Sequence, residues 1–104
     1  MSVKVTESDD NREVTLHISG RFDFSCHQPF VEGYRGYPKG EKRFVVDLEK
    51  TEYMDSSAMG MLLHLRDHSA KDRGDVSLIN ANESVMEILK IANFNKLFEV
   101  AGVE

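Results

Sequence analysis

Two stretches of alternating apolar and polar residues near the start of the chain are separated by a very short polar segment. Residues 9–12 leave room for a hairpin turn but not for the dozen or more residues that a crossover between parallel strands needs. Alternation with a period of two is typical of strands with one buried face. The sequence therefore predicts a β-hairpin whose inward-facing residues are Val3, Val5, Val14, Leu16 and Ile18.

A short helix and a buried strand are expected next. Gly20 interrupts the second alternating pattern, and residues 22–37 contain apolar side chains at helical spacing, although Pro29 weakens that pattern. Residues 44–48 form a mostly apolar run rich in β-branched side chains, which is typical of a strand buried on both faces. We expect this run to be the central strand, covered on both sides.

The clearest helical pattern begins at Ser57 and is expected to end at residues 73–75. A buried strand at residues 76–79 follows, and Asn80 with Glu83 offers capping chemistry for another helix. Residues 93–95 break that helix, and residues 97–100 are expected to add an edge strand. The apolar stripe of the first of these two helices is formed by Ala58, Met59, Leu62, Leu63 and Leu65.

The order of these elements predicts the fold class. A hairpin followed by strand–helix–strand–helix implies a mixed sheet of four or five strands, with helices on at least one face. The class is α/β, on the border with α+β. A length of 104 residues suits a single folded unit, so we expect residues 1–104 to form one domain.

Composition narrows the possible partners. The net charge of −5 opposes the phosphates of nucleic acids and anionic membrane surfaces, so neither is an expected partner. Cys26 is the only cysteine, which excludes an internal disulfide and a four-cysteine zinc site. Without a secretory signal or a long apolar stretch, the sequence predicts a cytoplasmic protein. No metal or cofactor is expected.

The most informative polar residues lie between the central strand and the long helix. Asp55 and Ser56 stand where side-chain oxygens cap the unpaired N–H groups of a helix, which is a sufficient structural role for one of them. Ser57 follows directly, so at least one hydroxyl exceeds what capping needs. An exposed hydroxyl at this edge of a sheet can be modified, and a phosphoryl group on Ser56 would add about −1.5 to −2 charge.

The segment Met54-Asp55-Ser56-Ser57-Ala58-Met59-Gly60 resembles the Asp-Ser-Ser-Gly-Leu-Gly segment of STAS-domain anti-sigma factor antagonists. The likeness covers nearly the whole chain in order. Residues 20–23 are similar to the Gly-x-Leu-Asp of that family, residues 44–48 to its central strand, and residues 91–98 to its Gly-Leu-x-x-Leu-Phe close. Ala58 departs from the usual glycine, and so does Asn93.

The resemblance implies a STAS-like binding module that is not an enzyme. Ser56 takes the place of the phosphoacceptor, and its unphosphorylated form would bind an anti-sigma factor, often a serine kinase of the GHKL type. A PP2C-like serine phosphatase would reset it. Stress response, sporulation, motility and biofilm formation all remain possible outputs, and Ser57 is an alternative acceptor. The residues expected at the partner-binding surface are Asp23, Met54, Asp55, Ser57, Ala58 and Met59. Phe24 and Met61 could extend its apolar part.

Two other interpretations use different residues. Asp47 together with Asp9 and Asp10 mimics the acidic cluster of a receiver domain that is phosphorylated on aspartate, but the hairpin leaves no room for the helix that a receiver needs there. His64 and His68 are four residues apart on the long helix, as in some metal sites. Because further ligands are missing, we interpret both as solvent-exposed.

Overall fold

The computed structural model describes residues 2–69 and 76–102 and contains one sheet of five strands in the order β1-β2-β3-β4-β5. The first pair is antiparallel and the other pairs are parallel, so the predicted mixed sheet is confirmed. The strands are β1 (Ser2–Glu7), β2 (Glu13–Phe22), β3 (Arg43–Met54), β4 (Val76–Ala81) and β5 (Glu99–Gly102). The helices are α1 (His27–Arg35), α2 (Ser56–His68) and α3 (Glu83–Ile91), with 3₁₀ turns η1 (Phe24–Cys26) and η2 (Phe94–Lys96).

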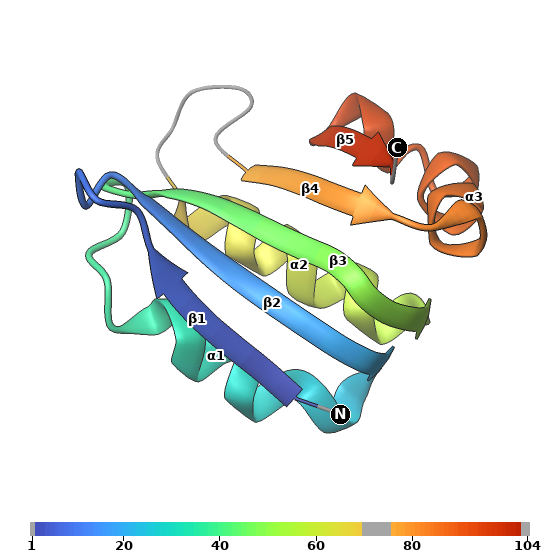
Figure 1. Ribbon diagram of the computed structural model, residues 1–104, viewed down its shortest axis with the longest axis horizontal. Coiled ribbons are helices and arrows are strands. Elements are labelled where there is room, and N and C mark those ends of the chain that lie inside the picture. The colour runs from blue at the N-terminus through green and yellow to red at the C-terminus, as the bar shows by residue number, and fades with distance from the viewer. Residues whose placement is uncertain (1, 70–75, 103–104) are drawn as a thin grey trace.

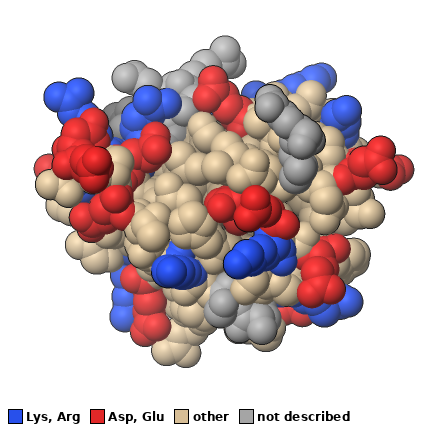
Figure 2. Space-filling view, viewed as in Figure 1, with Lys and Arg blue, Asp and Glu red and all other residues tan. Residues whose placement is uncertain are grey.

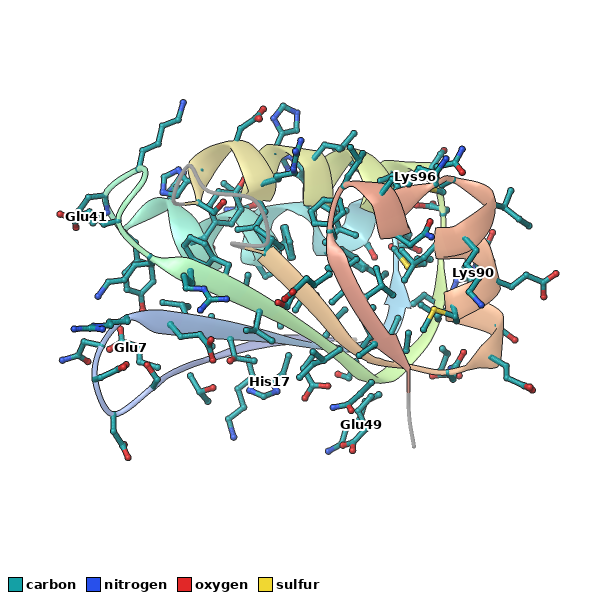
Figure 3. The ribbon with its side chains drawn as sticks, turned by 90° about the horizontal axis from the view of Figure 1, so that it is seen from above. Glu7, His17, Glu41, Glu49, Lys90 and Lys96 are labelled. Carbon is teal, nitrogen blue, oxygen red and sulfur yellow. The ribbon has the colours of Figure 1, made fainter. Side chains whose placement is uncertain are left out.

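All three α-helices lie on the same face of the sheet (Figures 1 and 3). Each one connects a parallel strand to the next strand along, and the strand order always advances in the same direction. Right-handed crossovers that never reverse direction place every helix on one side. The opposite face is therefore left without helices, and we call it the open face.

The predicted hairpin is confirmed, and one of its two aspartates has a local structural role. The backbone N–H of Ser8 donates to the Glu13 carbonyl at 2.9 Å, and Asn11 has a positive φ of 58° that asparagine tolerates in tight turns. Asp10 Oδ1 accepts from the Ser8 hydroxyl at 2.6 Å and from the Arg12 N–H at 3.1 Å. Asp10 therefore stabilises the turn between β1 and β2.

Burial alternates along the central strands, so the expectation that residues 44–48 are covered on both faces is wrong. Phe44, Val46 and Leu48 are buried under the helices, whereas Asp47 on the open face is only half-buried and Glu49 is exposed. A short apolar run is the usual pattern of a strand between two helical layers. Here the strand order advances in one direction only, so α1, α2 and α3 all lie on one face and the sheet has a helical layer on that face alone.

The central strands are longer than expected. Gly20 does not end β2, because its φ of 84° accommodates an irregular pairing with β3 while the strand continues to Phe22. β3 reaches Met54, so only Asp55 separates it from α2 and no longer loop exists there. Thr51 is buried, and its hydroxyl donates to the Ile18 carbonyl at 2.9 Å, which joins the two strands where their pairing is irregular.

The C-terminal third agrees with the prediction in order but not in detail. Asn82, not Asn80, caps α3, because its side chain accepts from the Val85 N–H at 2.9 Å. The edge strand begins at Glu99, two residues later than expected, after Asn93 adopts a left-handed conformation with φ of 60°. The expectation that the long helix ends at residues 73–75 is wrong, because α2 ends at His68 with Ser69 as its C-cap; residues 73–75 themselves lie outside the described residues. Among those residues, no helix has the length and apolar character needed to cross a membrane.

Adjacent leucines on α2 provide a test of this packing. Leu62 is fully buried, so Leu62→Ala is expected to lower the free energy of unfolding by about 2–5 kcal/mol through the lost contacts and the cavity left behind. Leu63 is 39% exposed, and Leu63→Ala is expected to cost about 0.5 kcal/mol or less. Urea unfolding followed by circular dichroism measures both. Equal losses would contradict the orientation of α2.

Candidate functional site

Two turns meet at one edge of the sheet, where β2 and β3 end side by side (Figure 1). Phe22 pairs with Met54 at the ends of these parallel strands, and the Asp55 N–H donates to the Phe22 carbonyl at 3.3 Å. Each strand is followed by an aspartate that begins a helical turn, Asp23 before η1 and Asp55 before α2. The pairing of the strands therefore brings together two aspartates that are 32 positions apart in the chain.

Asp55 caps α2, which confirms its predicted capping role. Its Oδ1 accepts from the Ala58 N–H at 3.1 Å and from the Ser57 hydroxyl at 2.6 Å. The hydrogen bond from the Ser57 hydroxyl does most to lower the pKa of the Asp55 carboxyl. The hydrogen bond from the Ala58 N–H lowers this pKa further, while slight desolvation opposes both. Asp55 is therefore ionised at neutral pH, beside the positive end of the α2 dipole.

Ser56 is the first residue of α2, and its side chain is exposed. Its hydroxyl makes no hydrogen bond to any residue that the structure describes, whereas the Ser57 hydroxyl is engaged with Asp55 at 2.6 Å. Ser56 thus carries the surplus hydroxyl of the Asp-Ser-Ser sequence. Its phosphorylation stays a prediction.

Asp23 adopts the same local geometry as Asp55. Its Oδ1 accepts from the Ser25 N–H at 3.0 Å and also from the Ser25 hydroxyl, and its Oδ2 lies 3.8 Å from the Arg21 guanidinium. Arg21 in turn lies over the Tyr53 ring, 4.7 Å from the centroid. Asp23 is partly exposed, and its turn lies next to the Asp55 turn because the Asp55 N–H donates to the carbonyl of the preceding residue, Phe22. Its contact with a partner stays a prediction.

Burial separates the apolar residues near Ser56 into two groups. The expectation that Met54 and Ala58 contact a partner is wrong for their side chains, which are 1% and 0% exposed. Met54 ends β3 on its inward face, and Ala58 lies on the inward side of the first turn of α2. Met61 is also buried, whereas Met59 is partly exposed and Phe24 is exposed, stacked on His27.

Tyr53 and Arg21 were missed at the sequence level. Tyr53 is 40% exposed beside the turns, and an irregularity in the β2–β3 pairing just before it changes the alternation of the strand. The sequence offered no local pattern for that irregularity, so only the strand pairing reveals it.

Ala58 does not disturb the backbone although glycine is usual there in the family that the sequence resembles. It lies within regular α2, and among the described residues the positive φ angles belong to asparagines and glycines only. A side chain at Gly60 would meet nothing within 4 Å, so there is open space beside this residue of α2. Asn93 does need its left-handed backbone, which asparagine adopts at low cost.

The receiver-like alternative is contradicted by the topology and by the acidic residues themselves. β1 pairs antiparallel with β2 without an intervening helix. Asp47 lies in the middle of β3, where it accepts from Asn80 Nδ2 and from the Glu49 N–H, each at 3.0 Å, and its Oδ2 is 2.9 Å from His17 Nδ1. Asp9 and Asp10 belong to the hairpin turn, so they do not form an acidic cluster with Asp47.

The two helix histidines differ in their surroundings. His64 is exposed as predicted, but His68 is half-buried, packs against Tyr34 with ring centroids 5.1 Å apart, and places Nε2 2.7 Å from the Tyr37 carbonyl. The interpretation of His68 as solvent-exposed is therefore wrong, because Tyr34 of α1 and Phe44 of β3 pack against its ring. Within residues 2–69 and 76–102, no group of three or more acidic, histidine or cysteine side chains is arranged to hold a metal ion.

The pH dependence of stability tests the contact between Ser57 and Asp55. The pKa of Asp55 is lower in the folded chain, so its ionised form stabilises the fold above the unfolded pKa, and this contribution is lost as pH falls through the folded pKa. Ser57→Ala removes the hydrogen bond that does most to lower the pKa of Asp55. We therefore expect an NMR titration of the Asp55 carboxyl carbon to show a raised pKa. Ser56→Ala should leave the pKa unchanged, and an equal rise in both variants would contradict the geometry.

Comparisons with known proteins agree on one family. The family model described as Mlab, STAS domain matches residues 5–100. A STAS-domain containing protein of Pseudomonas aeruginosa is 44% identical over 101 residues, which cover 97% of this chain and all of the relative. BtrV of Bordetella bronchiseptica, named as a candidate anti-sigma factor antagonist, is 30% identical over 64 residues, 62% of this chain and 55% of BtrV.

A solved structure shows the same fold at low identity. The crystal structure of a candidate anti-sigma factor antagonist from Thermotoga maritima superposes with a TM-score of 0.77 at 17% identity, covering 95% of this chain and 85% of that one. The fold is thus shared with a protein of low sequence identity. With a family model matching almost its entire length and a close relative matched along all of its own, this chain belongs to the STAS-domain family.

Proposed function

We propose that this protein is an anti-sigma factor antagonist whose binding is controlled at Ser56. In its unphosphorylated form it binds an anti-sigma factor through the surface formed by the two turns and the start of α2, and phosphorylation of Ser56 ends that binding. Membership of the STAS family and the name of the relative BtrV support the general role. The single observation that carries the switch is the exposed hydroxyl of Ser56, which bonds to none of the described residues, beside the capping carboxylate of Asp55.

The chemistry of the site suits a substrate serine rather than a catalytic one. No base lies in hydrogen-bond contact with the Ser56 hydroxyl among the described residues, so nothing there would activate it as a nucleophile. A kinase that approaches from solvent supplies its own base. Within a binding module, Ser56 is therefore better suited to be the substrate of a kinase than to act as a nucleophile.

Phosphorylation changes the docking surface more than the fold. A phosphoryl group adds about −1.5 to −2 charge, which the N-terminus of α2 tolerates because the helix dipole is positive there. Asp55 is ionised, so a partner would have to desolvate a dianion next to a carboxylate. The expected result is a folded protein that no longer binds.

The surface available to the partner combines carboxylates with exposed apolar groups. Asp23, Asp55, Ser57 and Met59 are each partly exposed, and Phe24 at 67% exposure adds an aromatic ring. Buried Met54 and Ala58 support this surface from below without reaching the partner. We propose that the partner is a cytoplasmic anti-sigma factor of the GHKL serine-kinase type and that a PP2C-like phosphatase restores the binding form.

Substitutions that add a negative charge in the first turn of α2 or of α3 test whether Ser56 controls binding. Ser56→Asp is expected to weaken binding of the anti-sigma factor at least about tenfold relative to Ser56→Ala, since one unpaired charge buried in an interface costs more than about 1.4 kcal/mol. Ser84 is also exposed in the first turn of a helix, α3, so Ser84→Asp adds the same charge to the same kind of position. Pull-down and calorimetry with anti-sigma factors from the same genome measure the effect.

The controls separate the switch from general effects of charge. Ser84→Asp should bind like the unmodified protein, and phosphosite mass spectrometry after incubation with the candidate kinases should place phosphate on Ser56. Modification of Ser57 alone would move the switch to the neighbouring residue and overturn the assignment. If Ser56→Asp held every partner as tightly as Ser56→Ala, the proposed control of binding would be wrong.

A further inference from the structure

The open face of the sheet contains a hollow that the proposed function does not use. Its volume is about 440 Å³, and the residues that line it come from β1, β2 and β3 and include Lys4, Thr6, His17, Asp47, Glu49 and Lys50. Figure 3 shows His17 and Glu49 projecting from this face, on the side of the sheet opposite to α2. The hollow shares no residue with the surface around Ser56.

An irregular pairing of the central strands forms one wall of the hollow. His17 pairs with Asp47 and Ser19 with Lys50, so β3 contains one more residue than β2 in this interval. The extra residue exposes both Glu49 and Lys50, where regular alternation would turn one of them inward. Bulges of this kind are frequent next to binding sites because they redirect side chains.

A chain of hydrogen bonds holds His17 in one orientation. Its Nδ1 lies 2.9 Å from Asp47 Oδ2, and its Nε2 lies 3.0 Å from the Thr6 hydroxyl. Asp47 is held in turn by Asn80, which adopts a φ of 60° within β4 and donates from Nδ2 at 3.0 Å. Four neighbouring strands thus contribute to the position of one imidazole ring.

The charged side chains that line the hollow differ in whether other residues of the protein bind them. Burial opposes ionisation of Asp47, but the bonds from Asn80, the Glu49 N–H and His17 outweigh it and hold its pKa below the usual value. That carboxylate is therefore ionised and already satisfied. Lys4 and Lys50 have no ion pair or hydrogen bond to any residue that the structure describes, so their charges are available to a ligand.

We propose that this hollow binds a small phosphomonoester. Its phosphate would lie between the ammonium groups of Lys4 and Lys50, beside the chain of hydrogen bonds that joins Thr6, His17 and Asp47. The volume suits a small molecule. A polyanion fits less well, because Figure 2 shows acidic and basic side chains mixed over this face and the chain carries a net charge of −5.

The test uses sn-glycerol 3-phosphate as the probe and uncharged glycerol as its control, at constant ionic strength. Titration into the full chain, followed by ¹H–¹⁵N NMR, is expected to give saturable shifts at the amides of residues 4–6, 17–19 and 47–50 with the phosphate only. Lys50→Gln and Lys4→Gln should each weaken binding about 1.5- to fivefold, as expected for one exposed ion pair. Glu49→Gln should strengthen binding, because it removes the one carboxylate in the hollow that has no internal donor.

Matched variants make the outcome decisive. Lys96 lies on the opposite side of the molecule from His17 (Figure 3), so Lys96→Gln should leave binding unchanged. Ser56→Asp should also leave it unchanged, which separates this inference from the proposed switch. Absence of saturable shifts, or equal weakening by Lys96→Gln, would overturn the proposal. So would a loss of anti-sigma factor binding in Lys50→Gln without any response to the phosphate, since the hollow would then be a protein interface.

Discussion

Three crossovers that advance in one direction across the sheet determine where every functional feature of this molecule lies. Because β2, β3, β4 and β5 follow one another without a reversal, right-handed connections place α1, α2 and α3 on one face. The helical face encloses the apolar core, and the opposite face remains polar and accessible. The same parallel arrangement brings the ends of β2 and β3 together, with Asp23 and Asp55 beginning adjacent helical turns.

The site around Ser56 depends on how these aspartates use their hydrogen bonds. Each carboxylate accepts from a backbone N–H and from the hydroxyl of the serine two positions on. The serine between Asp55 and Ser57 is left with an exposed hydroxyl that capping does not need. A modification there adds charge where the helix dipole stabilises it and where a docked partner would have to desolvate it, so binding can be controlled without unfolding the domain.

Local patterns were sufficient for the hairpin, the period of α2 and the cap at Asp55, since each depends on residues close together in the chain. They failed where a residue's environment is set by distant segments. Met54 and Ala58 were expected at the surface but are buried. β3 runs six residues further than the apolar run at residues 44–48 suggested, so Met54 is the last residue of the strand and faces inward, and Ala58 follows close behind it in the first turn of α2. Asn80 looked like a helix cap, yet its amide reaches across to Asp47 on β3.

The sequence by itself determined the order and type of the elements, the family resemblance and the serine that stands next to a capping aspartate, because periodicity and capping are properties of neighbouring residues. Only the tertiary structure decided that one face of the sheet is open, that Asp23 lies beside the Asp55 turn, and that His17, Asp47 and Asn80 form one network. These contacts join residues about 30 or more positions apart, and their geometry follows from strand register and crossover direction, which no local pattern encodes.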